Sequence, residues 1–295
     1  MSPEKIKEFF SGVDTNDFYE YYRAYLRKRR KELREATLEK YEDTLKILQE
    51  FSPTLNFSEI NFSFVKRFHE YLLNVRENNG GENNRHKNFK TVIRDAIYNG
   101  YTVEYPYGKF KLKHRIPETP YLSLNDLKKL ENLEFPPNKA TQEEIRDMFL
   151  FSCYTGLRYS DVTTLKWDHV DFKSGLLSKI QIKTNNIVEV GFCLKAINIA
   201  KKYEYRRKFS EYIFDAISNQ KTNQNLKKLA LLAGIKKRIT YHVSRHTFGS
   251  ILAEKNMNLS RIGKLMGHKS LKETQRYAKV SLQVLKDTVS VFDTV

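Results

Sequence analysis

Hydrophobic residues recur at three- and four-residue steps through the first hundred positions, a pattern typical of amphipathic helices. The stripes consist of Leu38, Tyr41, Leu45 and Leu48; of Val65, Phe68 and Leu72; and of Phe89, Val92, Ile93, Ala96 and Ile97. Thr37 and Ser63 precede the first two stripes and are residue types that favour helix starts. Asn99 and Gly100 are expected to end the third helix. This segment therefore predicts a small helical bundle.

Residues 101–120 interrupt the helical pattern with three prolines and with lysines at alternate positions. This composition favours an extended, basic linker. We place the domain boundary there. The predicted organisation is a helical domain over residues 1–110, a linker over 111–120 and a second domain over 121–295.

The second domain has mostly helical periodicity, with one island of alternating residues. Ser123 is followed at capping-box spacing by Asp126, which predicts a helix start. Residues 176–192 alternate apolar and polar on both sides of Thr184-Asn185-Asn186, and asparagine tolerates the left-handed conformation of tight turns. This segment predicts a β-hairpin with Lys183 at the tip of its first strand. The predicted fold class is therefore mostly α with a small β-hairpin.

Composition excludes several classes of protein. Of the 295 residues, 40% are hydrophobic and 13% aromatic, as expected of a globular chain. The longest purely apolar stretches, such as residues 148–151, are too short to span a bilayer, and the N-terminal MSPEKIKEFF lacks the apolar core of a secretory signal. Cys153 and Cys193 lack the spacing of metal ligands, so we expect no structural metal and no disulfide framework, and a reducing cytosol fits.

The charge balance gives the first indication of a partner. Lys and Arg total 52 against 35 Asp and Glu, a net charge of +17. Residues 1–115 carry 22 basic and 17 acidic side chains, and residues 116–295 carry 30 and 18, so the excess is not confined to one tail. Distributed positive charge favours a polyanion, because each neutralised phosphate releases condensed counterions. A soluble basic protein with no nucleic-acid role is the alternative.

Basic residues of the helical domain and the linker are candidates for DNA contact. They lie away from the third apolar stripe or alternate along the linker: Arg85, Lys87, Lys90, Arg94, Lys109, Lys111 and Lys113. For this segment taken alone, a solubilising surface is an equally good interpretation.

Short segments of the second domain carry polar residues that are ordinary when taken singly. The candidates are Arg158, Lys183, His242, Arg245, His268 and Tyr277. An arginine after the helix break at Gly156 is commonly a surface residue, a turn lysine is commonly solvated, and Tyr277 is one of 18 tyrosines. His268 follows Gly267 and has a helix cap as its simple interpretation. His242 and Arg245 lie three residues apart and so share one face of a predicted helix.

Together, two arginines, two histidines, a lysine and a tyrosine suit the cleavage of a phosphodiester. Attack on an already negative phosphate adds charge in the pentavalent transition state, and two guanidiniums can bind its non-bridging oxygens. Tyrosine is a weak nucleophile at neutral pH because its pKa is about 10, but a histidine can accept its proton while nearby positive charge stabilises the phenolate. A lysine can protonate the departing deoxyribose oxygen. This chemistry requires neither a metal ion nor another cofactor.

The order of these residues resembles that of the tyrosine recombinase, or phage integrase, family. The segments TGLRYSD, HVSRHTF and MGHKSLKETQRYAKV are each similar to signature segments of that family, and the nine-residue step from His268 to Tyr277 also matches. The similarity covers residues 120–280 closely and the helical N-terminal segment more loosely. It implies a helical core-binding domain and a mixed α/β catalytic domain that clamp DNA together.

The resemblance implies a role for each residue at the reacting phosphate. Arg158 and Arg245 would bind the scissile phosphate. Tyr277 would form a 3′-phosphotyrosyl link and release a 5′-hydroxyl, with Lys183 as the general acid.

The resemblance also implies roles for residues around the phosphate. His242 would act as general base or phosphate donor, and His268 would hydrogen-bond the phosphate. Asp161 would support the site.

The same resemblance implies an assembly and a biological setting. Four protomers on double-stranded DNA would exchange strands through a Holliday junction, whereas the free protein could be a monomer. The reaction would serve integration or excision of a mobile element in the bacterial cytoplasm, at the nucleoid, with DNA-bending or directionality proteins as possible helpers and no membrane.

Two features at the chain ends bear on assembly. Mobile-element integrases often carry an N-terminal arm-binding domain, and we expect none within these residues. Leu282, Leu285 and Val289 recur at helical spacing, and in the family such a tail packs onto a neighbouring protomer. Packing on its own chain is the equal alternative.

Two other functions compete with recombination. A type IB topoisomerase uses the same chemistry without a specific site. A basic DNA-binding protein that has lost catalysis is the third possibility, although retention of all six polar residues argues against decay.

Overall fold

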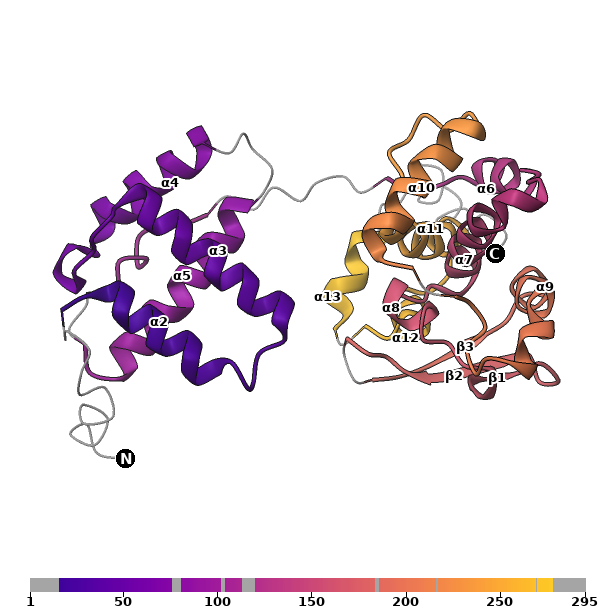
Figure 1. The fold of residues 1–295 in the computed structure, drawn as a ribbon, viewed down its shortest axis with the longest axis horizontal. Helices are drawn as coiled ribbons and strands as arrows, with labels where there is room; N and C mark the ends of the chain where they lie inside the picture. Colours follow the sequence, from indigo (N-terminus) through magenta and orange to yellow (C-terminus); the bar gives the residue numbers. More distant parts are fainter. Residues whose placement is uncertain are drawn as a thin grey trace, which may run out of the picture. The chain divides into compact units, whose positions relative to one another are not determined.

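The computed structural model describes residues 16–75, 81–101, 104–112, 120–183, 186–215, 217–268 and 270–277. The chain divides into two compact units, Met1–Ile116 and Pro117–Val295, and each is described by itself (Figure 1). Lys113, most of the predicted linker and the predicted tail residues Leu282, Leu285 and Val289 lie outside the described residues.

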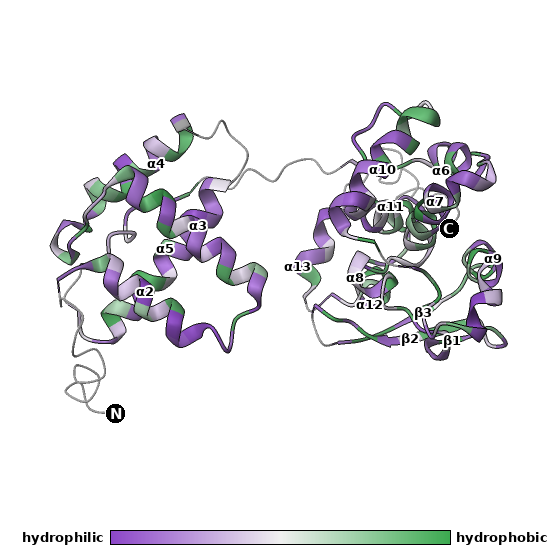
Figure 2. Cartoon of the chain, viewed as in Figure 1, coloured by the Kyte–Doolittle hydropathy of each residue, from purple (hydrophilic) through white to green (hydrophobic). Residues whose placement is uncertain are grey.

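The first unit is built from helices around an aromatic and aliphatic core. They are α2 (Phe18–Arg29), α3 (Glu35–Phe51), α4 (Phe62–Val75) and α5 (Gly81–Tyr98), with a 3-10 turn at Phe57–Glu59. Hydrophobic and hydrophilic residues alternate along these helices (Figure 2). Every residue of the three predicted stripes is buried, except that Ile97 is partly buried. The predicted helical bundle is confirmed.

Helix α2 is missing from the sequence prediction because its buried face is aromatic. Asp17 begins the helix, and its carboxylate accepts the backbone N–H of Tyr19 at 2.7 Å. Phe18, Tyr21 and Tyr22 are fully buried. A buried tyrosine is stable when its hydroxyl finds a partner, and the Tyr21 hydroxyl donates to the carboxylate of Asp95 at 2.5 Å.

The helix starts predicted at Thr37 and Ser63 are wrong by a few residues. Helix α3 already begins at Glu35, so Thr37 lies within its first turn. For α4, the side chain of Asn61 rather than that of Ser63 accepts a free backbone N–H, at 3.0 Å. An acidic first turn and an asparagine cap both favour helix starts. Glu35 precedes the predicted start at Thr37, and Asn61 precedes the predicted start at Ser63.

The second unit combines helices with a small sheet. Its helices are α6 (Leu124–Glu131), α7 (Ala140–Thr155), α8 (Tyr159–Val162), α9 (Leu194–Lys202), α10 (Asn219–Leu232), α11 (Tyr241–Glu254), α12 (Leu259–Met266) and α13 (Leu271–Thr274). Short 3-10 turns occur at Pro137–Lys139, Trp167–His169, Glu204–Lys208 and Gln275–Tyr277. The predicted capping box is confirmed: the Ser123 hydroxyl accepts the N–H of Asp126 at 3.1 Å, and the Asp126 carboxylate accepts that of Ser123 at 3.0 Å.

The sheet has the strand order β1–β2–β3, from strands Val170–Asp171, Leu176–Ile180 and Ile187–Gly191. Strands β2 and β3 are antiparallel, with Leu177 opposite Val190, and both of these residues are buried. The predicted hairpin is thus confirmed. Strand β1 is not predicted, because two residues are too few to show a period.

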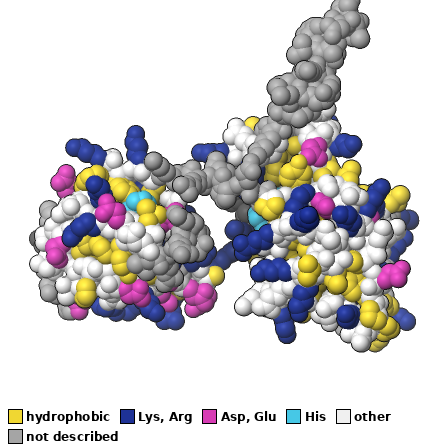
Figure 3. Space-filling view, turned by 90° about the horizontal axis from the view of Figure 1, so that it is seen from above, with side chains coloured by type: hydrophobic (Ala, Val, Ile, Leu, Met, Phe, Trp, Pro, Cys, Tyr) yellow, Lys and Arg dark blue, Asp and Glu magenta, His cyan; other side chains and the backbone are white. Residues whose placement is uncertain are grey.

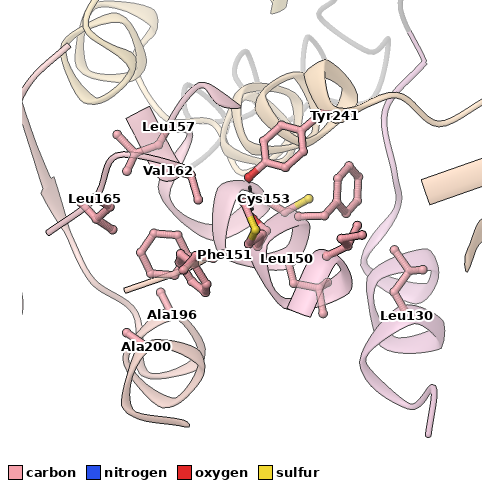
Figure 4. Packing of buried hydrophobic residues seen from close by; sticks show 14 of the residues in the cluster. Leu130, Leu150, Phe151, Cys153, Leu157, Val162, Leu165, Ala196, Ala200 and Tyr241 are labelled. Atoms are coloured by element: carbon pink, nitrogen blue, oxygen red, sulfur yellow. Dashed lines mark hydrogen bonds between the residues drawn. The ribbon is translucent and has the colours of Figure 1, made fainter. Parts of the chain in front are cut away.

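Helix α7 is the central helix of the second unit and is buried on nearly all sides over residues 144–153. Figure 4 shows Leu150, Phe151 and Cys153 of this helix among side chains from neighbouring elements. The hydroxyl of Tyr241, at the start of α11, donates to the carbonyl of Met148 at 2.8 Å. This contact ties α11 to α7, and both helices carry or precede candidate site residues.

Candidate active site

Arg158 follows the turn that ends helix α7. Gly156 has a φ of +70°, and a Cβ there would lie 2.5 Å from the ring of Phe248, so only glycine fits without displacement. The turn places Arg158 at the start of α8. Its Nη1 donates to Oε1 of Gln181 at 2.5 Å. The guanidinium is therefore held by the segment that follows strand β2.

Arg245 lies on α11 with only 3% of its surface exposed. Its Nη1 donates to the carbonyl of Gly156 and its Nη2 to that of Met266, each at 2.5 Å. Burial, reinforced by the charge of Arg158, lowers the pKa of Arg245 to about 10, so it stays cationic at pH 7. Two backbone carbonyls thus fix this cation between the end of α7 and the end of α12.

Asp161 supports the loop that carries Lys183. The carboxylate is fully buried, and its Oδ1 accepts the backbone N–H of Ile182 at 3.0 Å. Lys183 follows directly, so the buried carboxylate restrains the backbone from which the lysine projects. The neighbouring Lys179 is also buried and donates to the carbonyl of Thr164 at 2.5 Å.

His242 and His246 occupy successive turns of α11. Their rings meet edge to face with centroids 4.5 Å apart. Desolvation and then nearby cations, with Arg245 the strongest, lower the pKa of His242. Burial and then His242 lower the pKa of His246 to about 4. His246 is therefore neutral at pH 7.

The nucleophile candidate Tyr277 is seated against α11. Its hydroxyl lies 3.3 Å from Nδ1 of His246, and a Cβ on Gly249 would lie 2.7 Å from its ring. Burial raises the pKa of Tyr277, while Arg245, Arg276 and Arg158 act to lower it. His246 is thus the histidine whose ring nitrogen contacts the hydroxyl of this nucleophile candidate, and sequence reasoning did not single it out although it lies next to Arg245.

His268 follows the left-handed cap at Gly267, where φ is +62°. Burial and then the charges of Arg245 and Arg158 lower the pKa of His268 to about 4. The short helix α13 begins at Leu271, and the side chain of Ser270 at its cap position makes no hydrogen bond to the helix.

The predicted catalytic residues come together at one open pocket of about 410 Å³. It is lined by Arg158, Lys183, His242, Arg245, His268, Ser270, Lys272, Glu273, Arg276 and Tyr277. Lys272 and Arg276 were not predicted as site residues, although both lie shortly before Tyr277 in the sequence. Lys and Arg side chains gather on the visible face of this unit (Figure 3). Arginines and lysines outnumber the one carboxylate, that of Glu273, in the lining, so the pocket suits an anion.

Comparison with known proteins identifies the family of this chain. Residues 121–283 match the model of the phage integrase family, and residues 17–112 match that of the phage integrase SAM-like domain. The chain belongs to the phage integrase family. The match to the family includes every predicted catalytic residue.

Curated relatives within the family carry recombinase names. Tyrosine recombinase XerA of Pyrococcus furiosus is 28% identical over 184 residues, 59% of this chain and 63% of its own length. Tyrosine recombinase XerC of Thermodesulfovibrio yellowstonii is 30% identical over 199 residues, 62% of this chain and 64% of its own length. The chain thus spans less than two thirds of the length of these relatives.

Solved structures of integrases share the fold. The Tn1549 transposon integrase in complex with a circular intermediate DNA has a TM-score of 0.79 at 16% identity, covering 93% of this chain and 99% of that one. A lambda integrase tetramer bound to a Holliday junction has a TM-score of 0.73 at 15% identity, covering 90% and 78%. This family member is mostly helical with a small antiparallel sheet, as predicted.

The DNA-contact candidates of the SAM-like unit differ in whether other side chains already engage their positive charges. Arg85 forms an ion pair with Asp43 at 3.0 Å. Lys90 lies over the ring of Tyr107 at 4.5 Å, and Arg94 lies over that of Tyr105 at 5.2 Å. The other described members of the set are exposed: Lys87, Lys109 and Lys111.

Neither a membrane-spanning helix nor a metal-binding cluster is present in the described ranges. Their helices include none that combines the length and apolar character needed to cross a membrane. Within the same ranges, no three or more His, Cys, Asp or Glu side chains gather as a possible metal site.

Proposed function

We propose that this member of the phage integrase family is a site-specific recombinase that cleaves and rejoins DNA through a 3′-phosphotyrosyl intermediate. The observation that carries the proposal is the pocket itself. Arg158, Arg245 and Tyr277 come from separate segments of the chain and line one pocket together. A pair of fixed guanidiniums beside a tyrosine suits a reaction at one backbone phosphate.

The reaction follows from the residues around the pocket. Arg158 and Arg245 bind the two non-bridging oxygens of the scissile phosphate. The hydroxyl of Tyr277 loses its proton and its oxygen forms a bond to phosphorus, while the bond from phosphorus to the 5′-oxygen breaks. Lys183 gives a proton to that departing oxygen. Rejoining is the reverse, with a 5′-hydroxyl of a partner strand as the attacking group.

Charge explains how a buried phenol is activated. Burial disfavours the phenolate of Tyr277, and three arginines favour it. The negative charge of a bound phosphate offsets part of this stabilisation of the phenolate. Deprotonation of Tyr277 therefore needs a proton acceptor in contact with its hydroxyl. Of the two roles predicted for His242, phosphate contact has the better support, because the histidine beside the Tyr277 hydroxyl is His246.

The proposed partner is duplex DNA bound by both units. Support comes from the net charge of +17 and from relatives solved with circular intermediate DNA and with a Holliday junction. We propose that the first unit is the core-binding domain, with Lys87, Lys109 and Lys111 as its free phosphate contacts. A tetramer on DNA, and the integration or excision of a mobile element, complete the proposal.

The test is covalent capture on a nicked suicide substrate derived from the DNA that flanks the native gene. The protein should form an adduct that survives denaturation, at the same rate with or without EDTA. Tyr277→Phe should bind the DNA and form no adduct. An adduct with Tyr277→Phe would refute the assignment of the nucleophile, and relaxation of a plasmid without any specific site would favour a type IB topoisomerase.

A further inference from the structure

One buried hydroxyl holds the imidazole of His268. Nδ1 of this ring lies 2.7 Å from Oγ1 of Thr274, and Thr274 is fully buried. Thr274 does not line the pocket, so it cannot touch the phosphate itself. Its side chain is instead connected to the pocket by this hydrogen bond to His268.

The backbone fixes both partners of this contact. The N–H of His268 donates to the carbonyl of Gly263 at 2.9 Å, which anchors the residue to the end of α12. Gly263 also leaves room for the threonine, because a Cβ there would lie 2.9 Å from Oγ1 of Thr274. A glycine within a helix is unfavourable relative to alanine. The close approach of α13 to α12 accounts for a glycine at this position.

Hydrogen-bond accounting decides which ring nitrogen carries the hydrogen. A neutral imidazole has one N–H donor and one bare acceptor, and His268 is neutral at pH 7 because its pKa is about 4. Within the described part of the chain, the Thr274 hydroxyl has His268 as its hydrogen-bond partner. If Nδ1–H donated to Oγ1, the buried hydroxyl hydrogen would lack an acceptor, which is unfavourable. If the hydroxyl donates to Nδ1, both groups are satisfied.

We propose that Thr274 is a positioning residue that fixes His268 in the tautomer with its hydrogen on Nε2, so that this nitrogen donates to the scissile phosphate. The inference rests on the proposed function, because it gives the phosphate-binding histidine of that reaction its donor. With Nδ1 turned to a buried threonine, Nε2 is the nitrogen left for the pocket. A neutral imidazole in this tautomer can donate to the phosphate without first taking up a proton.

Loss of the hydroxyl should leave a folded protein with a less defined histidine. Thr274→Val keeps the shape of the side chain and removes the donor to Nδ1. The ring can then adopt either tautomer and rotate, so the fraction with Nε2–H toward the phosphate falls. Thr274→Ser keeps the hydroxyl and is the matched control. We expect about a tenfold slower adduct formation for Thr274→Val, with DNA affinity unchanged, and near-normal rates for Thr274→Ser.

The direct test is nitrogen NMR of the full-length protein without DNA, labelled with ¹⁵N in the histidine rings. Long-range proton–nitrogen correlations distinguish the nitrogen that carries hydrogen from the bare one, and His268→Gln assigns the signals. The wild type and Thr274→Ser should show His268 with hydrogen on Nε2, and Thr274→Val should show a mixture. Hydrogen on Nδ1 in the wild type, or an unchanged tautomer in Thr274→Val, would overturn the inference.

The cleavage assay separates this inference from the proposed function. If the wild type forms an adduct and Thr274→Val forms it equally fast, the inference fails and the function stands. If the wild type forms no adduct on any flanking DNA while the NMR signature is present, the proposed function fails instead. Should Thr274→Val not fold, the wild-type tautomer alone still decides the inference.

Discussion

Gln181 should control the cleavage rate although it lies just outside the pocket. Its Oε1 accepts a hydrogen bond from Arg158 at 2.5 Å, and its Nε2 donates to the carbonyl of Met266 at 3.2 Å. The same carbonyl accepts Nη2 of Arg245 at 2.5 Å. Gln181 thus links Arg158 to the carbonyl at the end of α12 that also holds Arg245, and only 1% of its surface is exposed.

Gln181→Met retains the volume of the side chain and removes both hydrogen bonds. A hydrogen bond to a charged group is worth about 1.5–3 kcal/mol. If Arg158 must be held in place to match the transition state, cleavage should slow by about 10- to 100-fold. Ground-state DNA binding should change little, because most of it comes from other phosphate contacts.

The assay is single-turnover adduct formation on the suicide substrate with protein in excess, beside a binding isotherm on the same DNA. Gln181→Glu is the informative control, because its carboxylate would pair with Arg158 and compete with the phosphate, and it should be slower than Gln181→Met. Thermal unfolding of each variant reports on folding. Wild-type cleavage by a folded Gln181→Met protein would refute the idea that this glutamine positions Arg158.

Three other outcomes follow from the structure. His246→Leu should slow adduct formation at least tenfold while His246→Asn, whose amide can replace Nδ1, retains more activity; equal rates in suicide-substrate cleavage would exclude a role at the Tyr277 hydroxyl. Burial lowers the pKa of His86 to about 3 from 6.5, so the unfolded chain binds more protons below pH 6.5. Acidification from pH 7.5 to 5.5 should then lower the free energy of unfolding of the first unit by about 1.4 kcal/mol. Amide exchange of α5 measures this, and His86→Phe should remove the dependence. Lys87→Ala should reduce the salt dependence of DNA binding more than Arg85→Ala, because Arg85 is already paired with Asp43; equal salt slopes in binding titrations would contradict this.

Local patterns were sufficient where a residue's environment is set by its neighbours in the chain. The stripe from Phe89 to Ile97 gave α5, and the alternation around residues 184–186 gave the β2–β3 hairpin. The buried residues of α2 are mainly aromatic, and α7 is buried on nearly all sides. In both helices the sequence shows no simple hydrophobic period. The wrong helix start at Thr37 has a different cause: Arg34 occupies the cap position of α3 without a side-chain hydrogen bond, so no cap-type residue marks the true start.

The sequence by itself determined which residues could handle a phosphodiester, because guanidinium, imidazole, amine and phenol groups carry their chemistry wherever they lie. It also determined the order that marks the family. Only the tertiary structure decided that these groups line one pocket, that His246 rather than His242 contacts the Tyr277 hydroxyl, and that Gln181 and Thr274 stand behind Arg158 and His268. The physical reason is that such contacts join residues far apart in the chain across helix and loop ends, where distance and burial are set by packing and not by spacing along the sequence.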